Sequence, residues 1–157
     1  MSHNDLTVLA SEKCIFCEIV KGRNEAYIFY EDKDIIGFMD LYPVDNGHSL
    51  IMPSKHYENI FDIDLSTYLR IHGLARILAM AMKDSLGADG INIGQNNGES
   101  ANQKVNHYHL HVIPRWRNND LNWARIEMSA AELKRNSDRL KSSLNALFDR
   151  SFKLSEC

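Results

Sequence analysis

Several features are scarce in this chain of 157 residues, and each scarcity narrows what the protein can be. No stretch of about 18 consecutive apolar residues occurs, so we expect no transmembrane helix and no membrane partner. Neither sign of charge dominates, because 18 basic residues stand against 21 acidic ones, and this balance argues against a nucleic-acid partner. The first residues lack the basic and apolar regions of a secretion signal, so a cytoplasmic location is expected.

The composition is typical of a globular domain, with 44% hydrophobic and 25% charged residues. The length predicts a single domain over residues 1–157 that can bury a real core. No internal repeat and no linker divides the sequence. Residues 1–12 are polar, and we expect them to be flexible.

Hydrophobic periodicity and turn signals predict an α+β fold with a largely antiparallel sheet. The expected order is a short helical piece at 14–20, strands at 27–30, 35–40 and 48–52, a helix at 62–86, strands at 91–95 and 107–114, and a C-terminal helix at about 129–149. That last helix opens with the capping-box pattern Ser129-x-x-Glu132. In the long helix, the apolar residues at helical spacing are expected in the core: Leu65, Leu69, Ala75, Leu78, Met82 and Leu86.

Three of the seven histidines, His107, His109 and His111, alternate with strand-forming residues. In an extended chain, successive side chains point to opposite faces, so the three imidazoles are expected on one face of a strand. Such a row can bind a metal ion, or it can hold an anionic group and attack it. On this motif alone the two interpretations are equally good.

Cys14 and Cys17 form a C-x-x-C pair. In a cytosolic protein this spacing indicates a metal site or a redox couple more than a structural disulfide. The pair is a weak signal by itself, because it supplies only two ligands.

Two further stretches accompany the histidine row: Gly47-His48-x-Leu50-Ile51-x-Pro53-x-x-His56, and Asn96-x-Gly98-x-x-x-x-Gln103 upstream of the row. Together with His-x-His-x-His, they resemble the histidine triad (HIT) family over roughly residues 14–116. The resemblance implies a HIT-like antiparallel half-sheet of about five strands, with one long central helix and a C-terminal helix. It also implies enzymes that hydrolyse or transfer at the α-phosphate of nucleotides, usually as homodimers that join two half-sheets.

The resemblance assigns the phosphate end of the site residue by residue. His109 matches the nucleophile, whose neutral imidazole would form a nucleotidyl-histidine intermediate. His111 matches a phosphate-binding histidine, and Gln103 and Asn96 match polar positions around the phosphate. His48 matches a strand histidine that helps to position the triad.

The nucleoside end is assigned in the same way. Asp40 matches an acidic residue that accepts hydrogen bonds from ribose hydroxyls, although it could also be a turn residue at the end of a strand. Phe16 and Phe38, with Ile15 and Leu50, are candidates for a base-holding pocket and equally for the core.

The resemblance also gives the cysteines their partners. In the zinc-carrying branch of the family, the ligands correspond to Cys14, Cys17, His56 and His107. This Cys₂His₂ set suits a tetrahedral, structural zinc ion with no open position, whereas the alternative is a reduced and buried thiol pair. No organic cofactor is expected.

The chain departs from the family pattern in one place and extends it in another. Some phosphoramidase members carry Ser after the glutamine, and Lys104 stands there, which disfavours efficient phosphoramidate cleavage. The tail after the triad looks like members that act on diadenosine polyphosphates. Its Arg115 and Arg117 could pair with distal phosphates, and Trp116 or Trp123 could stack on a second base or pack in a dimer interface.

The sequence therefore predicts a nucleotide hydrolase or nucleotidyl transferase that acts on a purine mono- or dinucleotide. Three alternatives stay open: a dinucleoside tetraphosphate phosphorylase, a nucleotide-binding partner protein with little turnover, and a metallohydrolase whose metal is catalytic.

Overall fold

The computed structural model describes residues 14–155, with side chains described to residue 150, so the flexibility expected for residues 1–12 lies outside the described residues. The strands are β1 (Ile28–Glu31), β2 (Ile35–Met39), β3 (Ser49–Pro53), β4 (Gly90–Gly94) and β5 (Leu110–Arg115). The helices are α2 (Ile15–Val20), α3 (Leu65–Leu86), α4 (Ala130–Ser155) and the short 3₁₀ helix η1 (Glu99–Ala101). The predicted α+β class and the order of elements are confirmed.

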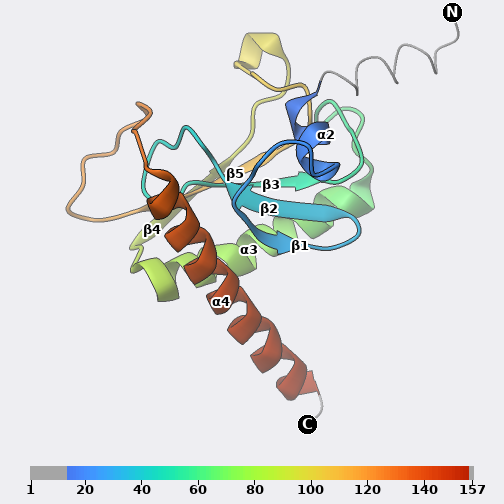
Figure 1. Cartoon of the computed structure of the whole chain (residues 1–157). Coiled ribbons are helices and arrows are strands. Elements are labelled where there is room, and N and C mark those ends of the chain that lie inside the picture. The colour runs from blue at the N-terminus through green and yellow to red at the C-terminus, as the bar shows by residue number, and fades with distance from the viewer. Residues whose placement is uncertain (1–13, 156–157) are drawn as a thin grey trace, which may run out of the picture.

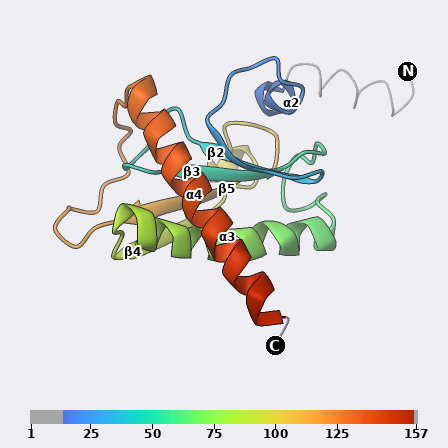
Figure 2. The ribbon, with the colours of Figure 1, turned by 60° about the horizontal axis from the view of Figure 1, so that its bottom comes forward.

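The five strands form one antiparallel sheet in the order β1-β2-β3-β5-β4 (Figure 1). Helix α3 lies under one face of this sheet, whereas α2 lies on the opposite side (Figure 2). Alternate strand residues divide accordingly, as the period of two requires. Ile51, Leu110 and Val112 pack with α3 and α4 in the larger core cluster. Phe38 and Leu50 pack with α2 in the smaller one, which places α2 on the face that carries His111.

The helix ends follow their local sequence signals. Asp64 caps α3 by accepting a hydrogen bond from the backbone N–H of Thr67, and Gly87 ends the helix in the left-handed conformation at φ 68°. In front of α4, the Glu132 carboxylate accepts from the Ser129 backbone N–H at 2.8 Å, which confirms the predicted capping box. Within the described residues, no helix is both long enough and apolar enough to cross a bilayer.

The main boundary difference concerns the last strand. β5 begins at Leu110 and not at His107, because the residues before it bond to a loop and not to a neighbouring strand. The backbone N–H of Tyr108 donates to the Tyr57 carbonyl at 2.6 Å. His48 likewise precedes β3, although it was expected inside that strand.

The core prediction for α3 is partly wrong. Ala75, Leu78 and Met82 are buried as expected. Leu65 and Leu69 are 70% and 58% exposed, because they lie on the side of the helix that faces away from the sheet. The long helix therefore carries an apolar outer surface near its N-terminus.

Candidate functional site

The candidate site lies on the α2 face of the sheet, where β2, β3 and β5 bring His48 and His111 together. The backbone N–H of Val44 donates to Nδ1 of His48 at 3.1 Å, and Nε2 of His48 lies 2.8 Å from Nδ1 of His111. Because Nδ1 of His48 is an acceptor, the proton of the neutral ring is on Nε2 and is donated to His111. His111 then carries its own proton on Nε2. One backbone amide therefore sets the tautomers of two imidazoles.

A second backbone group sets the tautomer of His109. Its Nδ1 lies 2.7 Å from the carbonyl oxygen of His107, so Nδ1–H is the donor and Nε2 keeps a free lone pair. The ring is packed edge-to-face against Phe16 at 5.1 Å and lies 5.0 Å from the His111 ring. Two neighbouring imidazoles thus present different atoms: a lone pair on His109 and an N–H group on His111.

Burial keeps these rings neutral. Loss of solvent lowers the pKa of His48 to about 4 and that of His111 to about 3, and it lowers the pKa of His109 as well. Asp40 opposes the shift for all three, but burial is the larger effect. At neutral pH the site therefore offers uncharged imidazoles, which is the form that can act as a nucleophile.

A cavity of about 320 Å³ opens in front of His109 and His111. Its apolar part is lined by Ile15, Phe16, Ile19, Phe38 and Leu50, and its polar part includes Asp40, Asn96, Asn102, Gln103, Lys104 and Arg125. The predicted base-pocket and phosphate-end residues therefore share one cavity, except for His48, which lies behind His111. An apolar slot that opens onto polar groups suits a ligand with a flat ring at one end and an anionic group at the other.

Two predicted polar residues have fixed partners. The Asp40 carboxylate accepts from the backbone N–H of Tyr42 at 2.8 Å, so it is a turn residue as well as part of the cavity wall. Gln103 is buried, and its side-chain carbonyl accepts from the Gly98 N–H at 2.7 Å. Its amide donates to the carbonyl oxygens of Glu58 and Val105 at 2.7 and 3.0 Å. Gln103 therefore holds the polar loop in shape beside the cavity.

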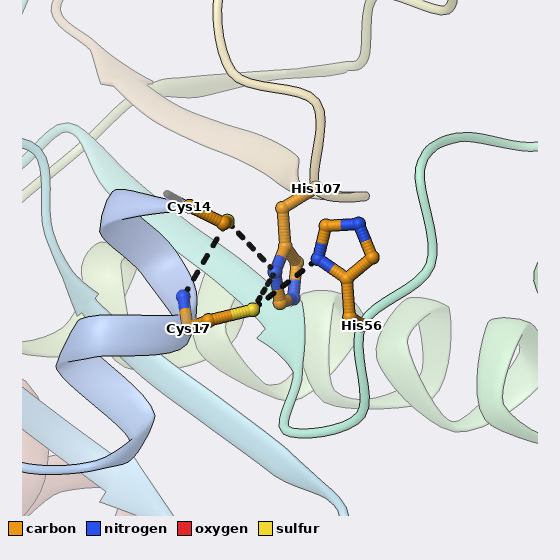
Figure 3. Close-up of side chains that lie close together, drawn as sticks. All are labelled: Cys14, Cys17, His56 and His107. Atoms are coloured by element: carbon orange, nitrogen blue, oxygen red, sulfur yellow. Dashed lines mark hydrogen bonds between the residues drawn. The ribbon is translucent and has the colours of Figure 1, made fainter. Parts of the chain in front are cut away.

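The four predicted metal ligands converge on one point (Figure 3). Cys14 Sγ and Cys17 Sγ lie 3.5 and 3.6 Å from Nδ1 of His107, and Cys17 Sγ lies 3.2 Å from Nδ1 of His56. Zinc bonds of about 2.3 Å to sulfur and about 2.0 Å to nitrogen place such ligands about 3.5 Å apart in a tetrahedron. The cluster therefore has the size and donor set of a tetrahedral metal site.

The chemistry of the ligands agrees with this fit. Nε2 of His107 donates to the Pro53 carbonyl at 2.8 Å, so its Nδ1 has the free lone pair that a metal needs. Burial and the neighbouring Cys14 thiol raise the pKa of Cys17 to about 11, and a bound cation would reverse this penalty by stabilising the thiolate. Of the three triad histidines, His107 faces this cluster while His109 and His111 face the cavity.

A second group, Asp40, His48 and His111, is also close enough to hold a metal ion. The tautomers argue against that use, because Nε2 of His48 carries the proton that it donates to His111. His48 and His111 are hydrogen-bonded to each other instead, and the Asp40 carboxylate lies 3.5 Å from Nε2 of His48.

Most of the tail residues expected to meet distal phosphates or a second base have other partners. The Arg115 guanidinium bonds to Asn92 and Asp45, at 2.9 and 3.1 Å, so it is a structural residue. Trp116 donates its indole N–H to the Leu86 carbonyl and packs on the larger core cluster. Arg117 is exposed, whereas Trp123 lines a second cavity beside the first.

Asn102 and Arg125 are among the cavity residues that were missed from the sequence. Asn102 lines the cavity from a left-handed turn at φ 64°. Arg125 reaches the site from the segment between β5 and α4, where its guanidinium donates to the Tyr42 carbonyl and lies 3.7 Å from the Asp40 carboxylate. No local motif marks either residue, since both reach the cavity only through the path of a loop.

The chain is similar to known proteins of one family. The HIT domain model matches residues 21–118. A HIT-like protein of Saccharolobus solfataricus is 42% identical over 103 residues, which cover 66% of this chain and 74% of that protein. The adenosine 5′-monophosphoramidase of Saccharomyces cerevisiae is 38% identical over 65% of this chain and 62% of its own length. An adenylylsulfatase of Arabidopsis thaliana is 32% identical over 77% of this chain and 61% of its own length.

Among solved structures, a zinc-bound histidine triad family protein from Mycobacterium smegmatis superposes with a TM-score of 0.81 and 33% identity. The match covers 89% of this chain and 99% of that one. The predicted half-sheet with its central and C-terminal helices is confirmed by this likeness.

Proposed function

The chain belongs to the HIT family, and from this premise we propose that it is a nucleotide hydrolase or nucleotidyl transferase acting at the α-phosphate of purine mono- or dinucleotides. One observation carries the proposal. The His107 carbonyl takes the Nδ1 proton of His109, which leaves the Nε2 lone pair free beside a cavity of nucleotide size. The names of the yeast and plant relatives, an adenosine 5′-monophosphoramidase and an adenylylsulfatase, support the same substrate class.

The reaction proceeds in two steps. Nε2 of His109 attacks the α-phosphorus, and the bond to the leaving group breaks with its electron pair going to the leaving oxygen. Water or another acceptor then attacks the phosphorus, breaks the P–N bond and releases the mononucleotide. His111 donates its Nε2 proton as a hydrogen bond to a non-bridging phosphate oxygen, where negative charge builds up.

The remaining residues bind or position. Phe16 and Phe38 enclose the base, Asp40 accepts from the ribose hydroxyls, and Asn96 donates to the phosphate. His48 fixes the tautomer of His111. Gln103 acts as a positioning residue, because its polar atoms are already bonded to the backbone.

Lys104 lines the cavity at the position where some phosphoramidase members carry Ser. A protonated amine is a poorer fit than a hydroxyl for relaying a proton to a leaving amine, but it attracts additional phosphate groups. We therefore favour anhydride or ester substrates over phosphoramidates.

We also propose that the Cys₂His₂ cluster holds a zinc ion with a structural role. All four positions of a tetrahedral ion are filled by protein ligands, so no position is left to activate water. When bound, the ion links α2 to the start of the triad segment. The zinc-bound relative supports this assignment.

The test is His109→Asn, assayed on diadenosine tetraphosphate. Product formation should fall by about three orders of magnitude or more, because no covalent intermediate can form, whereas AMP should bind within about threefold of wild type. Retained AMP binding shows that the variant is folded. If wild type and variant are equally inert on dinucleotides and phosphoramidates, the alternative of a nucleotide-binding partner protein is favoured. If both are equally active, His109 is excluded as the nucleophile.

Product analysis in the same assay separates the enzymatic alternatives. Attack at the α-phosphate releases ATP and leaves AMP on His109. Water then gives AMP, whereas inorganic phosphate gives ADP. AMP and ATP in the presence of phosphate indicate a hydrolase, and ADP and ATP indicate a phosphorylase.

A further inference from the structure

The apolar end of the candidate site's cavity carries one acidic side chain that the proposed reaction does not use. The lining residues from α2 and from the link between α2 and β1 are Ile15, Phe16, Ile19, Glu25 and Ala26. Glu25 is the only one of them with a polar side chain. It is exposed, and among the described residues its carboxylate has no hydrogen-bond or ion-pair partner. It also belongs to none of the motifs on which the family resemblance rests.

The register of the sheet shows at which end of the cavity Glu25 lies. Leu50 of β3 stands between His111 of β5 and Phe38 of β2. Ile28 of β1 continues this row. Neighbouring strands are about 4.8 Å apart, so the row extends about 14 Å from the triad to β1. Glu25 precedes Ile28 in the link that leads into β1, so it lies at the end of the cavity that is remote from the triad.

The orientation of a nucleotide in the proposed complex brings its base towards this end. The phosphate lies beside the triad histidines, the ribose lies at Asp40, and the ring lies between Phe16 and Phe38. The edge of a purine that faces away from the ribose then meets Glu25. That edge carries the groups by which one purine differs from another.

A carboxylate at this edge distinguishes guanine from adenine. Guanine presents two adjacent donors there, N1–H and the exocyclic N2 amino group, and a carboxylate has two acceptor oxygens and no donor. Adenine presents one donor, its N6 amino group, beside the acceptor N1, and a carboxylate oxygen repels the lone pair of that nitrogen. One acidic side chain therefore accepts two hydrogen bonds from guanine and only one from adenine.

We propose that Glu25 is a specificity-determining residue that selects guanine over adenine by accepting hydrogen bonds from N1–H and the N2 amino group. The inference rests on the proposed function, because it takes the orientation of the nucleotide from it. Adenine nucleotides remain ligands, since the apolar walls bind either purine. Because the carboxylate is exposed, the preference lies at the lower end of what a two-point base contact gives, about 5- to 20-fold.

Equilibrium binding of three mononucleotides to the wild-type protein tests this role. GMP should bind about 5- to 20-fold more tightly than AMP. IMP should lie between them, because hypoxanthine keeps N1–H and lacks the 2-amino group. In Glu25→Gln the ratio of the dissociation constants, AMP over GMP, should fall to about one or below, since an amide offers one acceptor and one donor and so matches adenine.

Two further variants control for charge and for folding. Glu31→Gln removes the same charge from an exposed position at the end of β1 that does not line the cavity. It should leave the AMP-over-GMP ratio within about twofold, because a remote exposed charge acts alike on all three anions. Glu25→Ala should weaken GMP to the affinity of AMP, while unchanged AMP binding shows that the site is intact. Equal affinities of wild type for GMP and AMP, or a ratio that Glu25→Gln leaves unchanged, would overturn the proposal.

These outcomes are separable from failure of the proposed function. If wild type turns over no nucleotide but prefers GMP through Glu25, base selection stands and the enzymatic function falls. If it cleaves diadenosine and diguanosine tetraphosphate with the same kcat/KM, and Glu25→Gln changes neither value, the function stands and Glu25 is a solvated residue at the cavity mouth. If neither GMP nor AMP binds, both proposals fall.

Discussion

Two backbone groups determine which ring nitrogen carries the proton in the histidines at the centre of the site. The Val44 N–H and the His107 carbonyl each bond to one imidazole nitrogen, and together they assign the protons of His48, His111 and His109. Protonating a buried neutral imidazole costs free energy. Acidification therefore destabilises the folded protein through these rings.

This burial predicts a stability change with pH. The unfolded imidazole protonates near 6.5, whereas His48 in the folded protein protonates near 4. The folded pKa is the lower one, so the contribution is present above about pH 6.5 and is lost as the pH falls towards 4. The expected loss in the free energy of unfolding is up to about 1.4 kcal/mol per pH unit for each such ring.

The His48→Asn variant removes one of these buried imidazoles, so comparing it with the wild type isolates the contribution of that ring. Urea unfolding at pH 7.5, 6 and 5 should show a shallower acid loss in the variant, by about the slope of one imidazole. The other groups that face His48 are present in both proteins: Asp40, Arg125, Arg115, Asp45 and His111. The Cys₂His₂ cluster is also common to both. Parallel curves for the two proteins would show that His48 is not a buried neutral imidazole.

At the residue scale, the sequence predicted those site residues that lie in short motifs. The alternation of His107, His109 and His111 was enough to place them on one side of the chain. The two histidines beside the C-x-x-C pair were assigned through the family resemblance, and the structure brings them to the cysteines. Arg125 and Asn102 could not be predicted in this way. Each reaches the cavity through a loop path that no periodicity encodes, and arginine and asparagine are common in solvated loops.

At the scale of elements, the stability of α2 depends on side-chain contacts, among them those of the Cys₂His₂ cluster. A helix of six residues cannot be stable by itself, because nucleation costs more than so few hydrogen bonds return. Its two cysteines face His56 and His107, and between them Phe16 packs against His109 at 5.1 Å. The cysteines of the Cys₂His₂ cluster and Phe16 of the cavity wall therefore come from the same short segment, α2 and its N-cap.

Cys17→Ser should consequently loosen α2 without unfolding the core. We expect bound zinc, measured by atomic emission, to fall well below one ion per chain. Amide protection at residues 15–20 should fall by about tenfold or more, while residues 71–82 of α3 keep theirs. Cys157→Ser is the matched thiol-to-hydroxyl control, because Cys157 is not one of the four predicted ligands. Unchanged protection of α2 in metal-free protein would contradict a structural role for the ion.

The existence of the strands and α-helices was predictable, whereas the 3₁₀ helix η1 and several element ends were not. Asp64, Gly87 and the Ser129–Glu132 box mark helix ends through their own hydrogen bonds, so these signals can be read from sequence. The start of β5 depends instead on what lies beside it. Tyr108 bonds to the loop at Tyr57, and a β pattern in the sequence cannot distinguish a loop partner from a strand partner.

At the scale of the whole molecule, one side of the protein is left apolar and unpaired. β4 forms an edge of the sheet, with Ile93 47% exposed on the α3 side. A groove of about 440 Å³ runs between β4 and α3, where Ala75, Ala79 and Met80 line it. Open strand edges beside apolar surface invite pairing with another chain. The outward Leu65 and Leu69 extend this surface along α3, which explains why the helix periodicity misled the core prediction.

We propose that a second copy of the chain covers this side, giving a homodimer in which two half-sheets meet. Ile93→Glu places a charge in the groove and should shift the molar mass, measured by light scattering at about 20 μM, from dimer to monomer. Ile126→Glu is the matched control, because Ile126 is 41% exposed but lies away from the groove. That control should remain dimeric. A wild-type protein with the mass of one chain would refute the dimer, whereas a dimer that tolerates Ile93→Glu and dissociates in Ile126→Glu would place the interface on the loop between β5 and α4.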